Sequence, residues 1–451
     1  MTFTQHLRAV LVLGLPLVGS HLAQFSVHVV DTIMLGRYDV TALAASVLAT
    51  SFFFVIFIMG AGFSFAVMPM VAEAAASDDS TRIRRVTRMG LWLSALYALV
   101  FLPLMIWSEP VLLAFGQDPE LASLAQDYLR IAGFGMFPAL LVMVVKSYLA
   151  ALERTAIVLW VTVLALVVNS GLNYVLIFGE FGAPELGVKG AALASVLAQI
   201  MTLLALGAYV VRSDATRDHV LFQNIWRPDP EAFREVFKLG WPIGLTNLAE
   251  SGMFSASALI IGLIGKLPLA AHGIALQITA ATFMVHVGLS QAATVRAGRA
   301  LGRRDWDGLA MGARAAVALS LGAVVMTTIA FLSVPELLMT GFLGADDPDR
   351  GAILAIGASL LAVAALFQLV DAGQVMALGL LRGMQDTRWP MYAAAISYWG
   401  LGIPASYVLG ITFGLGGVGV WIGLVVGLLF AAAALWWRYV QVLGALRERP
   451  A

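Results

Sequence analysis

Long apolar runs recur along the whole chain, and they constrain its fold more than any other feature. Segments such as residues 42–72 and 416–440 are mostly apolar, and each is longer than the roughly 20 residues with which a helix crosses a bilayer. Within the hydrocarbon core, only helices and closed barrels satisfy every backbone hydrogen bond. These runs are too long for barrel strands, so the sequence predicts an all-α membrane protein.

Twelve spans are predicted, at residues 9–35, 42–72, 88–115, 123–150, 156–178, 188–211, 235–264, 269–295, 311–342, 352–381, 389–411 and 416–440. The composition agrees, because 60% of the 451 residues are hydrophobic and only 12% are charged, against about 25% charged in soluble domains. The first span contains Pro16, His28 and Asp31 and has no small-residue cleavage site. We therefore interpret it as a retained helix and not as a signal peptide.

The charged residues mark the two ends of the spans. Most of the 27 Lys and Arg residues fall at alternate ends, and the opposite ends carry the acidic segments 108–110, 116–120, 179–185 and 344–349. The positive-inside rule then predicts that both termini of this multi-pass membrane protein are cytoplasmic. The arginine runs at 82–88 and 296–304 are typical of this topology signal and of contacts with anionic membrane lipids.

The two halves of the chain resemble each other. A shift of 226 positions places LGLPLVGSHLAQFSVHVVDTIMLG (13–36) on LGWPIGLTNLAESGMFSASALIIG (239–262), and it places Gly62 on Gly288. Internal repeats of this kind are common in transporters. We therefore predict two pseudo-symmetric six-helix bundles, at residues 1–211 and 235–451, joined by a cytoplasmic linker at 212–234.

Three carboxylates inside the spans are the main candidate functional residues. An ionisable residue at the bilayer centre costs at least about 2.5 kcal/mol and usually faces a bundle interior or a water-filled cavity. From the rise of a helix, Glu250 and Asp371 lie at similar depths in the second half, whereas Asp31 lies in the outer part of the first half. Together, Glu250 and Asp371 could bind Na⁺ through oxygen ligands or share a proton.

Polar residues accompany the carboxylates at helical spacing. The supporting candidates are Gln24, His28, Asn169, Asn173 and Gln368. The first two share a helix face with Asp31, and the two asparagines, one turn apart, offer amide oxygens at a compatible depth. Each of these has a structural alternative, because intramembrane carboxylates can hydrogen-bond across a helix interface, and histidines and asparagines can be satisfied interior residues.

Apolar residues and prolines complete the candidate set. An adaptable wall of a substrate cavity could come from Phe254, Met253, Met284 and Met376, since methionine fits varied ligands, although packing in the core is the favoured alternative for these four. The prolines Pro16 and Pro242 lie beside the polar residues and are candidate hinges, with an ordinary helix kink as the alternative.

Several classes of function are disfavoured. The net charge of zero argues against a nucleic-acid partner, and the absence of cysteine excludes disulfides and thiolate metal sites. There is no phosphate-binding loop, so ATP is not expected as the direct energy source, and no clustered metal or nucleophile motif that would favour an enzyme. The glycine pattern at 414–419 matches that of a dinucleotide-binding fold, but no predicted strand precedes it, so we do not interpret it as such a site. Any transport is therefore expected to be coupled to an ion gradient.

The motifs resemble those of the multidrug and toxic compound extrusion (MATE) family, and most closely those of its NorM-type bacterial branch. The resemblance is carried by VDTIMLG around Asp31, NSGLNYVLIFG with its two asparagines, LGWPIGLTNLAESGMF around Glu250 and LVDAGQVMALGLLRGMQDTR around Asp371. It implies two six-helix bundles around a central cavity. It also implies that Glu250 and Asp371 are the cation-coupling carboxylates and that Asp31, Asn169 and Asn173 form the polar site of the first bundle.

The function that this resemblance implies is secondary active multidrug efflux by a multi-pass protein of the bacterial cytoplasmic (inner) membrane. Bulky, often cationic drug-like compounds would leave the cell by antiport with Na⁺ or H⁺ through alternating access, with Na⁺, where it is the coupling ion, bound by Glu250 and Asp371. We expect no cofactor beyond the coupling ion, contacts with membrane lipids, and a monomer. The alternative is a flippase or exporter of a lipid-linked or single endogenous metabolite, but an anionic pyrophosphate substrate would require buried basic residues, which we do not expect near the carboxylates.

Overall fold

A computed structural model describes residues 1–343 and 348–448 of the chain. Across these residues it contains twelve helical segments that are long and apolar enough to cross a membrane, which confirms the predicted number of spans and the all-α fold. Residues 344–347 of the predicted acidic segment 344–349, and residues 449–451 of the predicted second bundle, lie outside the described residues.

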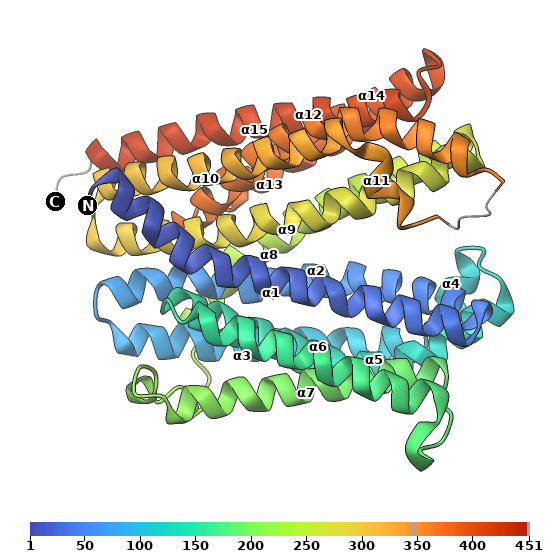
Figure 1. Ribbon diagram of the computed structural model, residues 1–451. Coiled ribbons are helices and arrows are strands. Elements are labelled where there is room, and N and C mark those ends of the chain that lie inside the picture. The colour runs from blue at the N-terminus through green and yellow to red at the C-terminus, as the bar shows by residue number, and fades with distance from the viewer. Residues whose placement is uncertain (344–347, 449–451) are drawn as a thin grey trace. The chain divides into compact units, whose positions relative to one another are not determined.

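The spans are formed by α1 (Phe3–Tyr38), α2 (Val40–Ala76), α3 (Ser80–Ile106), α5 (Pro119–Ala151), α6 (Thr155–Phe178), α7 (Val188–Arg212), α8 (Pro230–Ile264), α9 (Lys266–Arg303), α10 (Trp306–Ser333), α12 (Arg350–Gly383), the segment Arg388–Thr412 and α15 (Gly416–Glu448). The shorter elements are α4 (Glu109–Ala114), η1 (Glu180–Gly182), η2 (Arg217–His219) and α11 (Pro335–Thr340). Figure 1 shows these elements along the chain.

Two predicted spans were too long at their carboxyl ends. We expected helices over 88–115 and 311–342, but α3 ends at Ile106 and α10 ends at Ser333. In both places a new short helix begins after the break. Its first or second residue is a proline, Pro110 in α4 and Pro335 in α11. Proline has no backbone N–H and favours the first turn of a helix, so it separates two helices where hydropathy alone suggests one.

The span Arg388–Thr412 is irregular. It consists of α13 (Arg388–Ala395), the π-helical η3 (Ile396–Gly402), α14 (Ile403–Tyr407) and the π-helical η4 (Val408–Thr412). Wider π turns change the direction in which the following side chains point, and they often occur at functional sites. One of these turns carries Tyr398, which is fully buried.

The chain divides into two compact units, Gly19–Gly244 and a second unit made of Met1–Val18 and Leu245–Ala451. Both divisions fall inside a helix, α1 in one case and α8 in the other. Val18 and Gly244, where the divisions fall, are also placed on each other by the predicted repeat. The predicted bundle boundaries of 1–211 and 235–451 stay a prediction. The division into units shows in addition that the first helix of each half, α1 or α8, contributes residues to both units.

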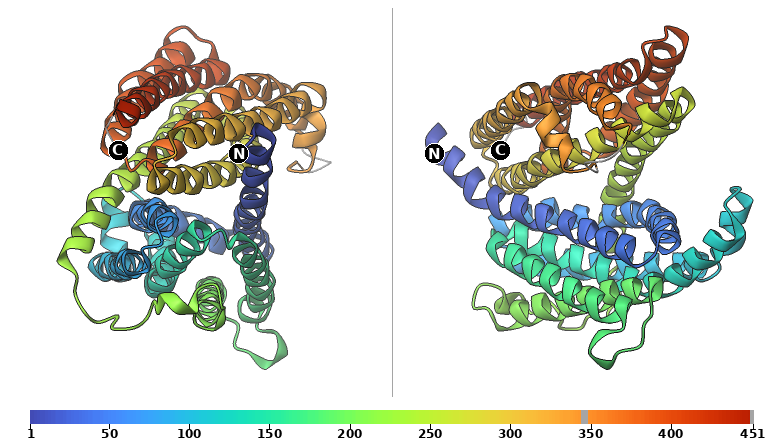
Figure 2. Two further views of the ribbon diagram at one scale, coloured as in Figure 1. Left: turned by 90° about the vertical axis from the view of Figure 1, so that its left-hand side faces the viewer. Right: turned by 45° about the vertical axis from the view of Figure 1, so that its right-hand side comes forward.

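The unit Gly19–Gly244 is a helical bundle, drawn in blue to green in Figure 1 and seen close to end-on in the left view of Figure 2. Its core contains fully buried Leu129, Met136 and Leu140 of α5, the helix that packs against α2, α3 and α7. The first part of α8 contacts α2 through glycines. A Cβ atom on Gly62 would overlap with the backbone of Gly240 and Gly244, so only glycine fits this crossing.

The second unit packs α9, α10, α12 and α15 around a core that includes Phe331, Tyr398 and Trp421. The first part of α1 contacts α9 here. A Cβ atom on Gly288 would lie 2.6 Å from the backbone nitrogen of Val18, so this crossing also requires glycine. The repeat places Gly288 on Gly62 and Val18 on Gly244. The same glycine-dependent helix crossing therefore occurs once in each unit.

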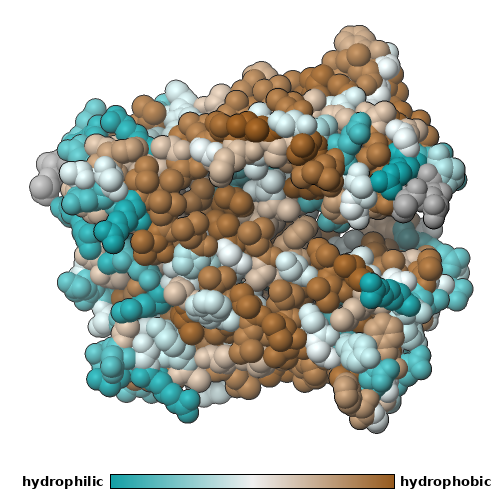
Figure 3. Space-filling view, viewed as in Figure 1, coloured by the Kyte–Doolittle hydropathy of each residue, from teal (hydrophilic) through white to brown (hydrophobic). Residues whose placement is uncertain are grey.

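Apolar side chains cover the sides of the helices. On the face shown in Figure 3, hydrophobic residues occupy the middle of the helices and hydrophilic residues gather towards their two ends. Exposed side chains such as Val100, Trp160 and Leu204 belong to this apolar surface. In water such a surface would be unfavourable, whereas in a bilayer it faces acyl chains. The chain is a multi-pass membrane protein.

Candidate functional site

Two carboxylates of the second unit lie close enough to interact. Glu250 comes from α8 and Asp371 from α12, and the charge of Glu250 acts on Asp371. Asp371 is buried, and Asp371 Oδ1 and Glu250 Oε1 have no hydrogen-bond partner among the described residues. Buried polar atoms are nearly always paired. Two unpaired acceptor oxygens in one cluster have the chemistry to accept a cation or a proton.

A basic residue also belongs to this cluster. The charge of Arg382 on α12 acts on Glu250, and Arg382 Nη2 donates a hydrogen bond to Asn247 Oδ1 at 2.7 Å. Our expectation that no basic residue lies near these carboxylates was wrong, because Arg382 was assigned to the end of its span from sequence position alone. A long arginine side chain reaches well beyond its own backbone.

Two further polar residues were missed from the sequence. Gln374 Nε2 donates a hydrogen bond to the Tyr398 hydroxyl at 2.5 Å, and both side chains are buried. The charges of Glu250 and Asp371 act on Tyr398, while Gln374 Oε1 has no partner among the described residues. Tyr398 enters this cluster from a π turn, which hydrophobic periodicity does not reveal. The cluster thus has three unpaired acceptor oxygens, each of a type that suits a hard cation.

The predicted polar site of the first half is assembled in the unit Gly19–Gly244. Asp31 Oδ1 accepts hydrogen bonds from Asn169 Nδ2 at 2.6 Å and Asn173 Nδ2 at 2.5 Å. The two asparagines are buried because their spacing of four residues places both on the inner face of α6. Both Oδ1 atoms lack a partner among the described residues, so they remain available as acceptors.

Two neighbours of Asp31 were not predicted. The side chain of Ser195 on α7 lies close enough to act on Asp31. Tyr128 of α5 lies close to the same serine and is acted on by the charge of Asp31. Both come from helices on which no candidate residue was predicted. Neither serine nor tyrosine is unusual in an apolar span, so the sequence offered no signal for them.

Comparison with known proteins identifies the family of the chain. Residues 16–175 and 242–408 each match the model of the MatE family. The chain belongs to the MatE family. The two matches begin at Pro16 and Pro242, which the repeat places on each other, so they agree with the predicted internal repeat.

This MatE protein is similar in sequence to named relatives along nearly its whole length. It is 44% identical to an Agrobacterium fabrum protein named "Probable multidrug resistance protein NorM", over 97% of this chain and 94% of the relative. The predicted resemblance to the NorM-type branch is confirmed.

Solved structures show the same fold. A MOP superfamily transporter from Pyrococcus furiosus superposes with a TM-score of 0.88 at 20% identity, over 100% of this chain and 99% of that chain. A structure described as MATE in the bent conformation gives a TM-score of 0.87 at 20% identity, over 99% of both chains. The predicted MATE-like fold is confirmed.

The remaining polar candidates of this MatE protein lie in different surroundings. His28 is exposed and its charge acts on Asp31, while Gln24 is half-buried on the same helix. Gln368, in contrast, accepts a hydrogen bond from Thr327 at 2.6 Å and donates one to Thr282. Its side chain therefore joins α12 to α10 and α9.

The four candidate cavity residues divide into two groups. Met253 and Met376 are fully buried, so the alternative interpretation of core packing describes them in this structure. Phe254 and Met284 are half-buried, and the Phe254 ring packs edge-to-face on Phe367 with a centroid separation of 5.9 Å. A role in substrate contact stays a prediction for all four.

The two candidate hinge prolines occupy equivalent positions in this MatE protein. Pro16 lies inside α1 and Pro242 inside α8, each two residues before the point where its helix passes from one compact unit to the other. An internal proline removes one helical hydrogen bond and weakens the helix locally. Both α1 and α8 are thus weakened close to the point where each passes from one compact unit to the other.

Proposed function

We propose that this MatE protein is a secondary active multidrug efflux transporter and not an enzyme. It exports bulky, often cationic organic compounds by antiport with Na⁺ or H⁺ through alternating access. The multidrug resistance name of its close relative supports the substrate class. The observation that carries the coupling is the cluster of Glu250, Asp371 and Arg382, with its unpaired carboxylate oxygens.

The charges of the cluster favour a single monovalent cation. Two ionised carboxylates and one guanidinium leave a net charge of about minus one, and an uncompensated charge is costly inside a membrane. One Na⁺ or one proton would neutralise the cluster. The unpaired oxygens of Glu250, Asp371 and Gln374 are the candidate ligands of Na⁺. Among the described residues there is no group of three or more His, Cys, Asp or Glu side chains that could hold a metal, so amide and hydroxyl oxygens would have to contribute.

Asp31 supplies a second cation site in the first half. Its two asparagine partners hold the carboxylate in place and leave their own oxygens free to accept. Such a site could take a proton, a small cation or the amine of a drug. Competition between a coupling cation and a drug cation for carboxylates gives antiport, because occupation by one removes the attraction for the other.

The test is efflux of a fluorescent organic cation from proteoliposomes, with Na⁺ and pH gradients imposed separately. We expect one gradient to drive efflux in the wild type, and Glu250→Gln or Asp371→Asn to abolish it while leaving the folded fraction unchanged. The matched control is Asp307→Asn, because Asp307 is a 95% exposed carboxylate on α10. Normal efflux by both cluster variants would contradict the proposed coupling. If neither gradient moved any such compound, the multidrug function would be contradicted and an exporter of a lipid-linked or single metabolite would be favoured.

A further inference from the structure

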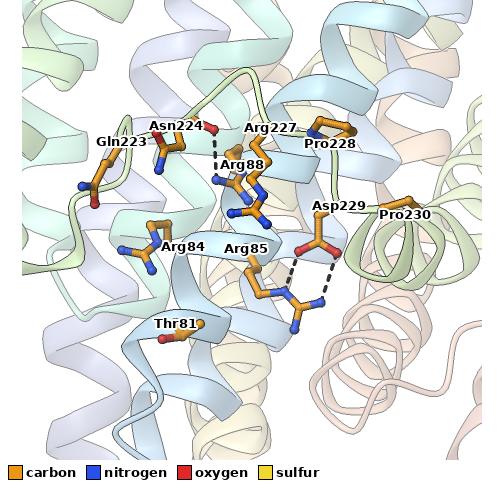
Figure 4. Close-up of a pocket in the computed structure, with 10 residues that line it drawn as sticks. All are labelled: Thr81, Arg84, Arg85, Arg88, Gln223, Asn224, Arg227, Pro228, Asp229 and Pro230. Carbon is orange, nitrogen blue, oxygen red and sulfur yellow. Dashed lines mark hydrogen bonds and ion pairs between the residues drawn. The ribbon is translucent and has the colours of Figure 1, made fainter.

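A basic pocket of about 410 Å³ lies in the unit Gly19–Gly244, where the first turns of α3 meet the loop 213–229. Figure 4 shows Arg84, Arg85 and Arg88 on the first turns of α3 and Arg227 reaching towards them from the loop. The acidic residue among the lining side chains is Asp229. Four of the ten lining residues are arginines, and one is acidic.

The acidic neighbours are already used by one of these arginines. Arg85 Nε and Nη2 lie 2.5 and 3.0 Å from the two carboxylate oxygens of Asp229, and Arg85 Nη2 lies 2.6 Å from Glu231 Oε2. This pairing keeps the pKa of Asp229 below its usual value, so the carboxylate is ionised at neutral pH. Within the described residues no salt bridge is found for Arg84, Arg88 or Arg227, which leaves the pocket net positive.

Arg88 is the least expected member of the pocket. It is only 7% exposed, and Arg88 Nη1 donates to the backbone oxygen of Asn224 at 3.1 Å. Its Nε atom is buried without a hydrogen-bond partner among the described residues. A buried donor on a charged group is costly when it is left unpaired. A buried, incompletely paired guanidinium at a pocket therefore points to an anionic ligand.

The fold itself does not require these arginines. The repeat places Ala310 and Met311 at the positions of Arg84 and Arg85, and it places the exposed Arg314 at that of Arg88. The second half thus builds the same helix without a basic cluster.

The loop that closes the pocket is held in position. Trp92 Nε1 donates to the backbone oxygen of Ile225 at 2.7 Å, and the Tyr148 hydroxyl lies 2.7 Å from His219 Nδ1. A ring contact between Trp92 and Trp226 adds to these, with centroids 6.3 Å apart. The wall that carries Arg227 is therefore anchored to α3 and α5.

We propose that this pocket binds a phosphate-bearing anion through Arg84, Arg88 and Arg227. Guanidinium groups recognise phosphate through paired, charge-assisted hydrogen bonds. The phosphate can belong to the headgroup of an anionic lipid or to a soluble phosphate compound. Occupancy would tie α3 to the loop that leads directly into α8 at Pro230.

The test measures ligand binding to the purified full-length protein by native mass spectrometry. One arm titrates phosphatidylglycerol, with phosphatidylcholine as the uncharged comparison, and the other titrates inorganic phosphate and glycerol phosphate. The variants are Arg84→Gln, Arg227→Gln and Arg88→Gln, with Arg303→Gln on α9 as a control of equal charge change. Arg227 and Arg303 are exposed, so these two variants retain the fold even where Arg88→Gln does not.

We expect the binding of one phosphate-bearing probe to be saturable and to weaken about tenfold in Arg84→Gln and Arg227→Gln, as for the loss of one charge-assisted hydrogen bond, but not in Arg303→Gln. Dependence on these arginines in the phosphatidylglycerol arm alone identifies a lipid headgroup. The same dependence in the inorganic phosphate or glycerol phosphate arm identifies a soluble ligand. Binding of every probe that is equal in all four variants and the wild type would overturn the proposal.

Discussion

At the scale of single residues, amides control the surroundings of the first-half carboxylate. Asp31 Oδ1 accepts from both Asn169 and Asn173, and these amides come from one face of α6. In a low-dielectric interior, a carboxylate without donors is far more costly than one that accepts two hydrogen bonds. The asparagines are therefore expected to contribute to stability as well as to any cation site.

Replacement of Asn173 by alanine tests this contribution. We expect Asn173→Ala to lower the free energy of unfolding by about 1–3 kcal/mol, because Asp31 loses a buried donor. The measurement is thermal unfolding of the purified protein in detergent. The control is Ser170→Ala on the same helix, whose hydroxyl donates a hydrogen bond to the backbone oxygen of Leu166. An equal effect of both changes would mean that the contact with Asp31 contributes little.

At the scale of elements, the loop 213–229 is fastened by a titratable contact. His219 lies against Tyr148, and burial lowers the pKa of His219 below its usual value of 6.5, with Asp218 acting in the opposite direction. The neutral imidazole is thus favoured in the closed loop. A lowered pKa in the folded state gives a stabilisation that is complete above pH 6.5 and is lost as the pH falls through the lowered pKa.

We therefore expect the loop to open more readily in mild acid. Hydrogen exchange of the backbone amides of residues 213–229, followed from pH 7.5 to pH 5 and corrected for intrinsic exchange, should show protection falling below about pH 6.5. The variant His219→Asn keeps a polar side chain without a titratable group and should remove this pH dependence. A pH profile that is unchanged in His219→Asn would show that another group controls the loop.

The two glycine crossings form a second feature at the element scale. We expect Gly62→Ala and Gly288→Ala each to destabilise the protein by about 1–3 kcal/mol, because an added Cβ overlaps with the backbone of the crossing helix. Gly322→Ala on α10 is the control, since no atom lies within 4 Å of an added Cβ there. That change should stabilise by about 0.4–1 kcal/mol. Thermal unfolding distinguishes the two cases, and tolerance of alanine at Gly62 and Gly288 would contradict the close crossings.

At the scale of the whole molecule, the proposed transport by alternating access requires helices that can bend at defined points. Pro16 and Pro242 lie two residues before the divisions between compact units. We expect Pro16→Ala and Pro242→Ala to slow efflux several-fold, while the affinity for the fluorescent substrate stays near that of the wild type. Stopped-flow efflux and equilibrium binding separate these effects. Pro103→Ala in α3, at an exposed proline away from the divisions, is the control, and an equal loss of rate there would contradict the hinge.

Sequence alone determined the class of the molecule. Apolar runs show twelve spans because the bilayer leaves the backbone few alternatives, and the carboxylates Asp31, Glu250 and Asp371 stand out because a charge in such a run is costly. The motifs around them led to the MatE family, and the repeat shift led to the equivalence of Pro16 and Pro242.

Only the tertiary structure decided which side chains meet. Arg382 and Tyr398 join Glu250 and Asp371 through a long side chain and a π turn, whereas Gln368 bonds to threonines of α9 and α10. The basic pocket likewise depends on a loop that folds back onto α3. Depth and helical face can be counted along one helix, but contacts between helices depend on rotation, crossing and reach, which no single span encodes.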